Sequence, residues 1–141
     1  MNKGNESGRK GHRGYIGSRP YDGQRVPQHV QNLVIRDYCR RNDFHYLLSA
    51  TEYAMTGCYM MLEELAAEAQ ALDGIVLYSI NMLPRRPDRR LDVCGRILAG
   101  GATLHGAVEN LSICDGHDLV RLNELLVLSK VVIGSPAEVG L

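Results

Sequence analysis

The run Ile75-Val76-Leu77-Tyr78-Ser79-Ile80 constrains the fold more than any other segment of this chain. It is apolar almost without interruption and follows the turn-forming pair Asp73-Gly74, so it lacks the alternation of a strand with one wet face. A strand that is apolar on both faces needs helices on both sides, as in a parallel α/β sheet. The segment therefore predicts a central strand over residues 75–80.

The rest of the chain alternates between strand and helix patterns. β-Branched and aromatic runs predict strands, whereas apolar residues at spacings of three and four predict amphipathic helices. The predicted strands are residues 14–18, 44–49, 75–80 and 103–108, and the predicted helices are residues 28–41, 58–72, 88–99 and 118–131. This order predicts an α/β fold of three layers with a mostly parallel, flavodoxin-like sheet of four or five strands.

The length of 141 residues fits one domain, which at this size buries roughly 70% of the surface of its unfolded chain. Residues 1–13 are polar, basic and rich in glycine, which predicts a disordered tail. Residues 14–132 hold every predicted element and form the single α/β domain, and residues 133–141 are expected to be a C-terminal tail.

Composition argues against several classes of site. The four cysteines and five histidines show no metal-binding spacing, and neither a dinucleotide-binding nor a P-loop glycine pattern occurs, so we expect no metal and no cofactor. No apolar stretch approaches the roughly 20 residues that span a bilayer, and no signal peptide is recognisable. We therefore expect a reduced, cytoplasmic protein without a membrane span.

Positive charge gathers in two places. Residues 1–41 hold nine Lys and Arg against three Asp and Glu, which suits an anionic partner. The second cluster, residues 85–90, is diluted by Asp88 and Asp92 and has no interleaved aromatic residue for stacking on bases. We interpret it as a solvated helix start, and we do not expect nucleic acid as the partner.

In doubly wound folds, ligands bind outside the carboxyl ends of the strands, where the strand order reverses. The loops expected there carry polar and charged side chains that suit an anion or a sugar, with arginines as planar anion holders. These candidate binding residues are Ser18, Arg19, Arg25, Thr51, Tyr53, Ser79, Asn81 and Arg85. If the chain is an enzyme, Glu52 and Glu109 are the candidate acid/base groups. Ordinary solvation of the loops is the competing interpretation.

The last predicted helix is unusually apolar. Its pattern places Leu119, Leu122, Leu126 and Val127 on one stripe, and neighbouring leucines widen that stripe toward a second face. The surplus apolar surface predicts self-association, with a homodimer through this helix as the simplest form.

Three literal runs carry a resemblance to a known family: GYIGSRP over residues 14–20, RVPQHVQNLVIRDYC over 25–39 and LLSATEYAM over 47–55. They closely resemble the sporadic carbohydrate cluster proteins, and the resemblance covers about residues 12–113. It implies a product of bacterial gene clusters for surface-polysaccharide or lipopolysaccharide sugars, with proteins of the same cluster as partners. It implies a pathway but no reaction.

The order of elements is also similar to the catalytic domain of resolvase-type serine recombinases. That family has a Tyr-x-Arg-x-Ser strand end, a helix glutamine, and Asp-Arg-Leu-Gly-Arg after the third strand. Tyr15, Gln31, Leu83 and Arg85 match this pattern, which adds Gln31 to the candidate binding residues. The resemblance implies a resolvase-like arrangement of the predicted sheet.

The positions that differ from the recombinase pattern are those of its reactive residues. Gly17 stands where the arginine would be, Arg19 stands where the serine nucleophile would be, and Asn81 and Met82 replace the Asp-Arg pair; Ser18 is one position out of register. The transition state of phosphodiester attack needs several cations, and losing one such donor typically costs roughly 2.7–4 kcal/mol of barrier. We therefore predict no strand cleavage.

Together, the residues and the resemblances predict a small cytoplasmic protein of surface-carbohydrate biosynthesis that binds or modifies an anionic or nucleotide-linked sugar. Two alternatives stay open. One is a non-catalytic assembly subunit of the same pathway, and the other is a degenerate recombinase-like domain that binds nucleic acid.

Overall fold

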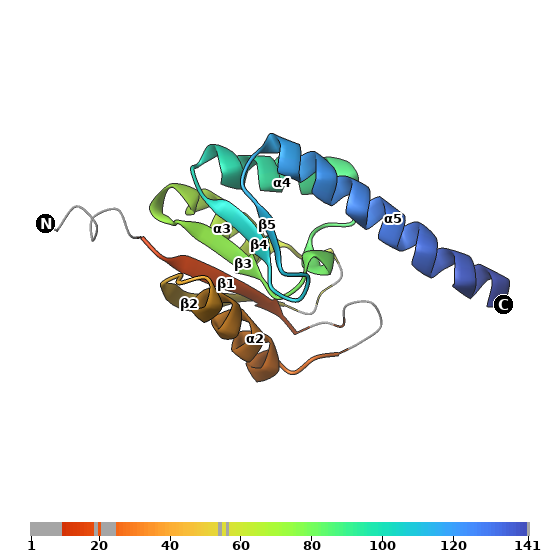
Figure 1. The fold of residues 1–141 in the computed structure, drawn as a ribbon, viewed down its shortest axis with the longest axis horizontal. Coiled ribbons are helices and arrows are strands. Elements are labelled where there is room, and N and C mark those ends of the chain that lie inside the picture. The colour runs from red at the N-terminus through yellow and green to blue at the C-terminus, as the bar shows by residue number, and fades with distance from the viewer. Residues whose placement is uncertain (1–9, 19, 21–24, 54, 56, 141) are drawn as a thin grey trace, which may run out of the picture.

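The computed structural model describes residues 10–18, 20, 25–53, 55 and 57–140, with side chains up to Leu128. Four strands run parallel: β1 (His12–Gly17), β2 (Tyr46–Glu52), β3 (Gly74–Leu77) and β4 (Thr103–Gly106). A fifth, β5 (Leu111–Ile113), pairs antiparallel with β4. They form one sheet in the order β2-β1-β3-β4-β5, which confirms the predicted mostly parallel α/β sheet (Figure 1).

The helices make the outer layers. Helix α2 (Gln28–Arg41) covers one face of the sheet, and α3 (Met60–Ala67) and α4 (Pro87–Ala99) cover the other. Two 3-10 turns, η1 (Ala69–Ala71) and η2 (Ile80–Met82), follow α3 and β3. Helix α5 (Gly116–Gly140) lies against α4 and β5 and then projects beyond the sheet (Figure 1). No helix among the described residues is long and apolar enough to span a bilayer.

The central strand is β3, as the apolar run predicts. All four of its residues are buried. Ile75 and Leu77 belong to the larger apolar cluster beneath α3 and α4, whereas Val76 packs with Ile35 of α2 in the smaller cluster. Because successive side chains of a strand point to opposite faces, both faces of β3 are covered.

Several strand bounds differ from the prediction, and two of the differences change the site. Strand β2 runs to Glu52, so Thr51 and Glu52 belong to the strand rather than to the loop after it. Strand β3 ends at Leu77 instead of Ile80, because the hydroxyl of Ser79 accepts the backbone N–H of Asn81 at 3.1 Å and starts η2.

The ends of the chain also differ from expectation. Strand β1 begins at His12, two residues earlier than predicted, so His12 is buried and stacks on Phe44 with ring centroids 3.8 Å apart. Helix α2 has the predicted bounds, whereas the backbone of α5 stays helical to Gly140, past the predicted end at residue 131. The fifth strand, β5, fits the predicted sheet of four or five strands, although the sequence pattern assigns no residues to it; it follows a tight turn in which Asn110 takes a φ of 55°.

A buried polar cluster fills the space beneath α2. The Nδ1 atom of His105 lies 3.0 Å from the hydroxyl of Tyr38 and 3.1 Å from that of Ser112, and its Nε2 atom lies 2.8 Å from the hydroxyl of Thr103. Burial, with a smaller contribution from the charge of His12, lowers the pKa of His105 to about 4. His105 is therefore neutral near pH 7 and ties β4 to α2 and β5.

Candidate functional site

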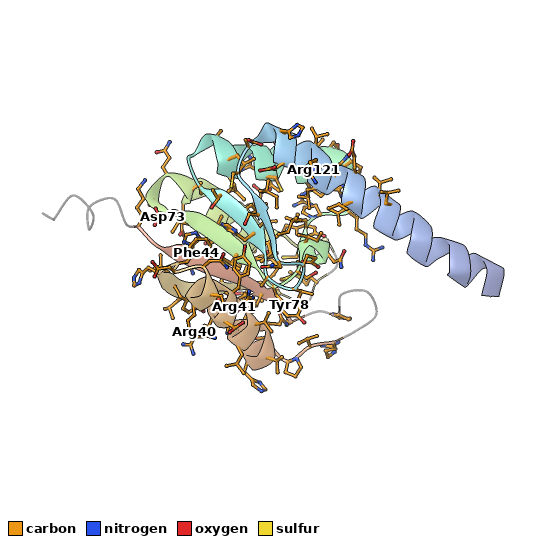
Figure 2. The ribbon with its side chains drawn as sticks, viewed as in Figure 1. Arg40, Arg41, Phe44, Asp73, Tyr78 and Arg121 are labelled. Carbon is orange, nitrogen blue, oxygen red and sulfur yellow. The ribbon has the colours of Figure 1, made fainter. Side chains whose placement is uncertain are left out.

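The strand order places the candidate site between β1 and β3. From β1 the chain crosses to β2 on one side, and β3 then pairs with β1 on the other side. The order reverses at this pair, and in doubly wound folds ligands bind outside the carboxyl ends of strands at such a switch point. Figure 2 helps to locate it, because Asp73 marks the amino edge of the sheet and Tyr78 lies toward the carboxyl edge.

The carboxylate of Glu52, at this edge of the sheet, forms hydrogen bonds with other groups of the protein. It accepts the hydroxyl of Tyr15 at 2.7 Å and the backbone N–H groups of Met61 and Leu62 at 3.1 Å, and the thiol of Cys58 lies 3.4 Å away. The side chain is fully buried. Since the amide groups belong to the first turn of α3, the carboxylate acts as that helix's N-terminal cap.

Glu109 plays a similar part between the loops after β3 and β4. Its carboxylate accepts the hydroxyl of Ser79 at 2.7 Å and the backbone N–H of Ile80 at 3.0 Å. Gly106 is tight against this pair, because a β-carbon there would lie 2.8 Å from the Glu109 carboxylate. The half-buried Glu109 therefore fixes the chain where it leaves β3.

Gln31 joins α2 to the end of β1. The backbone N–H of Gly17 donates to its amide oxygen at 3.0 Å, and its amide nitrogen donates to the carbonyls of Gly17 and Val26 at 2.8 Å. Next to it, the hydroxyl of Ser18 donates to the carbonyl of Glu52 at 3.3 Å, and the guanidinium of Arg25 donates to the carbonyl of Ser18 at 2.9 Å. The loop after β1 is thus anchored at both ends.

The remaining candidates lie nearer the surface. Thr51 is half-buried at the end of β2, whereas Tyr53, Asn81 and Arg85 are exposed. The Arg85 guanidinium has no carboxylate partner in the described part of the chain. Arg19 lies outside the described residues. The structure therefore links Ser18 to Arg25 and to the backbone of Glu52 by hydrogen bonds, and holds Gln31 beside them through Gly17. Ser79 and Glu109 form a separate hydrogen-bonded pair.

Arg90 is a functional candidate that the sequence did not indicate, because it is 5% exposed although it is charged. Its guanidinium donates to the carbonyls of Pro84 and Arg85 at 3.0 and 3.1 Å and also to the side chain of Asn123 on α5. Burial lowers its pKa. The missed signal was spacing, because Arg90 falls on the same helical stripe as the buried Val93, Cys94 and Ile97.

Two of the four cysteines, Cys39 and Cys94, are buried and unreactive. Burial raises the pKa of Cys39 to about 11 and that of Cys94 to about 12, so both thiols stay protonated. None of the four cysteines forms a disulfide bond within the described part of the chain. In the described part of the chain, no group of three His, Cys, Asp or Glu side chains is arranged to hold a metal ion.

Two solved structures are similar to this chain in their fold. A resolvase family site-specific recombinase from Streptococcus pneumoniae matches with a TM-score of 0.58 and 12% identity, covering 91% of this chain and 94% of the other. The N-terminal catalytic domain of TP901-1 integrase matches with a TM-score of 0.61 and 14% identity, covering 86% and 97%. The fold is resolvase-like. No protein-family model matches this chain, and no curated protein is similar to it.

Within this fold, the residues that match the recombinase pattern are mostly structural. Tyr15 is fully buried and holds Glu52, Gln31 is 1% exposed and holds Gly17, and Leu83 belongs to the core. Arg85 alone among the four matched residues faces solvent. Three of the four matched residues thus serve the packing of this edge, and only Arg85 is available to an external partner.

Proposed function

We propose that this chain is a resolvase-fold binding protein that does not cleave nucleic-acid strands and that holds an anionic ligand at the β1/β3 edge. The observation that carries the proposal is that the acidic and amide side chains of this edge bond within the protein, whereas an arginine of the edge does not. Glu52, Glu109 and Gln31 are engaged in internal hydrogen bonds, whereas Arg85 is exposed without a carboxylate partner among the described residues. An edge built in this way is suited to binding more than to proton transfer.

The loop that carries Arg85 is held in place. The buried guanidinium of Arg90 binds the carbonyls of Pro84 and Arg85, so the backbone of the loop is fixed while the Arg85 side chain stays in solvent. The neighbouring Arg86 differs, because it pairs with Asp88 at 2.7 Å. An arginine that is carried by a fixed loop and has no acidic partner can bind a phosphate or carboxylate through two parallel N–H groups.

For the ligand class, we propose a phosphorylated or nucleotide-linked sugar, with Arg25 and Arg85 as anion contacts and Ser18, Thr51, Tyr53, Ser79 and Asn81 around it; Arg19 completes the set in the proposal. The support is the sequence resemblance over residues 12–113, which implies the synthesis of surface polysaccharide or lipopolysaccharide. The competitor is nucleic acid, because the two similar solved structures are a recombinase and an integrase domain.

Arg85→Ala should weaken binding of a nucleotide sugar about ten- to a hundredfold, because it removes a charge-assisted contact worth roughly 1.5–3 kcal/mol. Thermal unfolding should stay nearly unchanged, since Arg85 is exposed. Arg86→Ala is the matched control: it removes the same charge one residue away, but from a surface pair with Asp88, and should leave binding within about threefold.

The measurement is isothermal titration of a panel of nucleotide sugars and sugar phosphates, run beside a duplex and a single-stranded oligonucleotide. Tight, salt-sensitive binding of the oligonucleotides alone would assign the edge to nucleic acid. If neither millimolar sugar phosphates nor the two oligonucleotides give any binding heat, the anion site is refuted. Covalent attachment of DNA to Ser18 would refute the non-cleaving assignment.

A second candidate function, assembly through α5, is favoured by the surface of that helix. Leu119 and Leu122 are buried, but Val120, Leu125, Val127 and Leu128 are 46% to 60% exposed, so the predicted place of Val127 on the buried stripe is wrong. The sequence of the projecting part continues with further apolar residues. A helix that is apolar around most of its circumference is usually buried.

We propose a homodimer through α5, with proteins of the same carbohydrate cluster as further partners. Leu125→Glu together with Leu128→Glu should weaken the dimer at least tenfold, because each change places a charge in the apolar contact. Sedimentation equilibrium measures this effect, and Arg121→Glu, an exposed change on the same helix, is the control (Figure 2). A monomer at all concentrations for the unaltered chain would refute the dimer.

A further inference from the structure

A groove lies on the surface between α2 and the outer edge of the sheet. It has a volume of about 290 Å³ and is lined by His29, Asn32, Leu33 and Arg36 of α2 and Tyr46 of β2. Strand β2 is an edge strand, and no strand in the described part of the chain pairs with its outer side. Such an edge presents unpaired backbone N–H and C=O groups. Tyr46 also packs against the smaller apolar cluster, but the proposed anion site does not use this surface.

The walls of the groove are held by hydrogen bonds. The hydroxyls of Tyr46 and Ser49 lie 2.7 Å apart, and the Ser49 hydroxyl donates to the side-chain oxygen of Asn32 at 2.7 Å. The guanidinium of Arg36 lies over the Tyr46 ring, 5.4 Å from its centroid. Gly14 makes room for this network, because a β-carbon there would lie 2.1 Å from the Ser49 hydroxyl. The groove is therefore built in advance of any partner.

The charge of the groove is positive and uncompensated. Arg40 and Arg41 at the end of α2 share Asp37, and Arg40 projects outward from the helix (Figure 2). Arg36 has no ion pair within the described residues, and the nearby His29 is exposed. A carboxylate of a partner would give Arg36 a charge-assisted hydrogen bond that this chain does not supply.

Two exposed leucines add an apolar component. Leu33 on α2 is 59% exposed, and Leu48 on the edge strand is 78% exposed. A partner with alternating acidic and apolar side chains in an extended conformation matches this surface, because an added strand presents its side chains alternately to the two faces. A nucleic acid matches it less well, since the backbone phosphates would need several unpaired cations and would leave the leucines uncovered.

We propose that this surface binds an acidic, extended peptide segment of a partner protein. The segment adds to the sheet as a sixth strand beside β2, forms main-chain hydrogen bonds with its outer edge, and places a carboxylate against Arg36. Its apolar side chains cover Leu48, and the methylene groups of an acidic side chain lie beside Leu33, which is on the same helix as Arg36.

The test is an NMR titration of the full-length, ¹⁵N-labelled chain with the acidic peptide EVDVEVDV. We expect the largest shifts at the amides of β2 and at those of α2 between His29 and Arg36. Arg36→Gln should weaken binding at least tenfold, whereas Arg40→Gln, the matched control on the same helix, should change it by less than twofold. A version of the peptide that is N-methylated at alternate residues keeps its charge but cannot pair as a strand, and should not bind.

Three results would overturn the proposal. The first is the absence of chemical-shift changes in β2 at millimolar EVDVEVDV. The second is equal binding of the N-methylated peptide or of the lysine peptide KVKVKVKV. The third is tighter binding of an oligothymidine, with an affinity that Arg36→Gln lowers. The last result would assign the groove to nucleic acid. Arg85→Ala should leave peptide binding unchanged, so failure of this proposal and failure of the anion site are distinguishable.

Discussion

Leu77→Asp should abolish soluble expression of this protein. Leu77 is fully buried in β3, the strand that is covered by helices on both faces. A carboxylate there either ionises in a medium of low dielectric constant or stays protonated without a hydrogen-bond partner, and both states cost several kcal/mol. With about 5–15 kcal/mol of total stability in a typical domain, a loss of about 4–5 kcal/mol or more leaves little folded protein.

The measurement is the soluble fraction after expression, followed by thermal unfolding of any protein recovered. Leu48→Asp is the matched control, because it makes the same change in strand β2, where Leu48 is 78% exposed. That variant should express normally and lose at most about 1 kcal/mol. A Leu77→Asp protein that unfolds at the temperature of the unaltered chain would show that β3 is not the centre of the core.

The layers of the fold could be predicted because they follow from residue patterns that act locally. The uninterrupted apolar run around Leu77 indicates a doubly covered strand, and the amphipathic pattern of residues 28–41 gives α2 with its observed bounds. Strand β5 could not be predicted in this way. It has three residues and forms because it pairs with β4 after the turn at Asn110, which is a tertiary effect.

The position of several candidate residues at the carboxyl edge could also be predicted, but their hydrogen-bond partners could not. Sequence position alone brings Ser18, Ser79 and Glu109 to the carboxyl edge of the sheet, where they lie. The pattern could not show that Glu52 ends a strand and points its carboxylate at the first turn of α3, ten residues later in the chain. That contact depends on how α3 packs against the sheet.

The structural roles of Gln31, expected as a binding residue, and of Arg90, expected in a solvated helix start, could not be predicted for a similar reason. Both are polar residues on the buried stripes of otherwise amphipathic helices, α2 and α4. A polar group at such a position has to find hydrogen-bond partners in the folded chain. Gln31 finds the end of β1, and Arg90 finds the loop that carries Arg85. Polar residues on an apolar stripe are therefore useful markers of a fixed loop.

The assignment of Glu52 as a cap rather than as an acid/base group has a direct test. Glu52→Gln keeps the size of the side chain but replaces one acceptor oxygen with an NH₂ group, which faces N–H and S–H donors at Met61 and Cys58. It also removes the negative charge at the first turn of α3. We expect the free energy of unfolding to fall by about 2–4 kcal/mol, because a buried donor left without a partner typically costs 1–3 kcal/mol.

Two further variants separate the structural role from a catalytic one. Glu68→Gln, the control, alters a partly exposed carboxylate whose partner is Arg13, and should lose less than about 1 kcal/mol. Tyr15→Phe removes the hydroxyl that donates to Glu52 at 2.7 Å, and should cost less in the Glu52→Gln background than alone, because the two changes break the same hydrogen bond. Chemical denaturation of the four proteins in this cycle gives the coupling energy. If Glu52→Gln has the same free energy of unfolding as the unaltered chain and shows no coupling to Tyr15, capping of α3 does not account for the buried carboxylate. Glu52 is then the leading candidate for proton transfer at the β1/β3 edge.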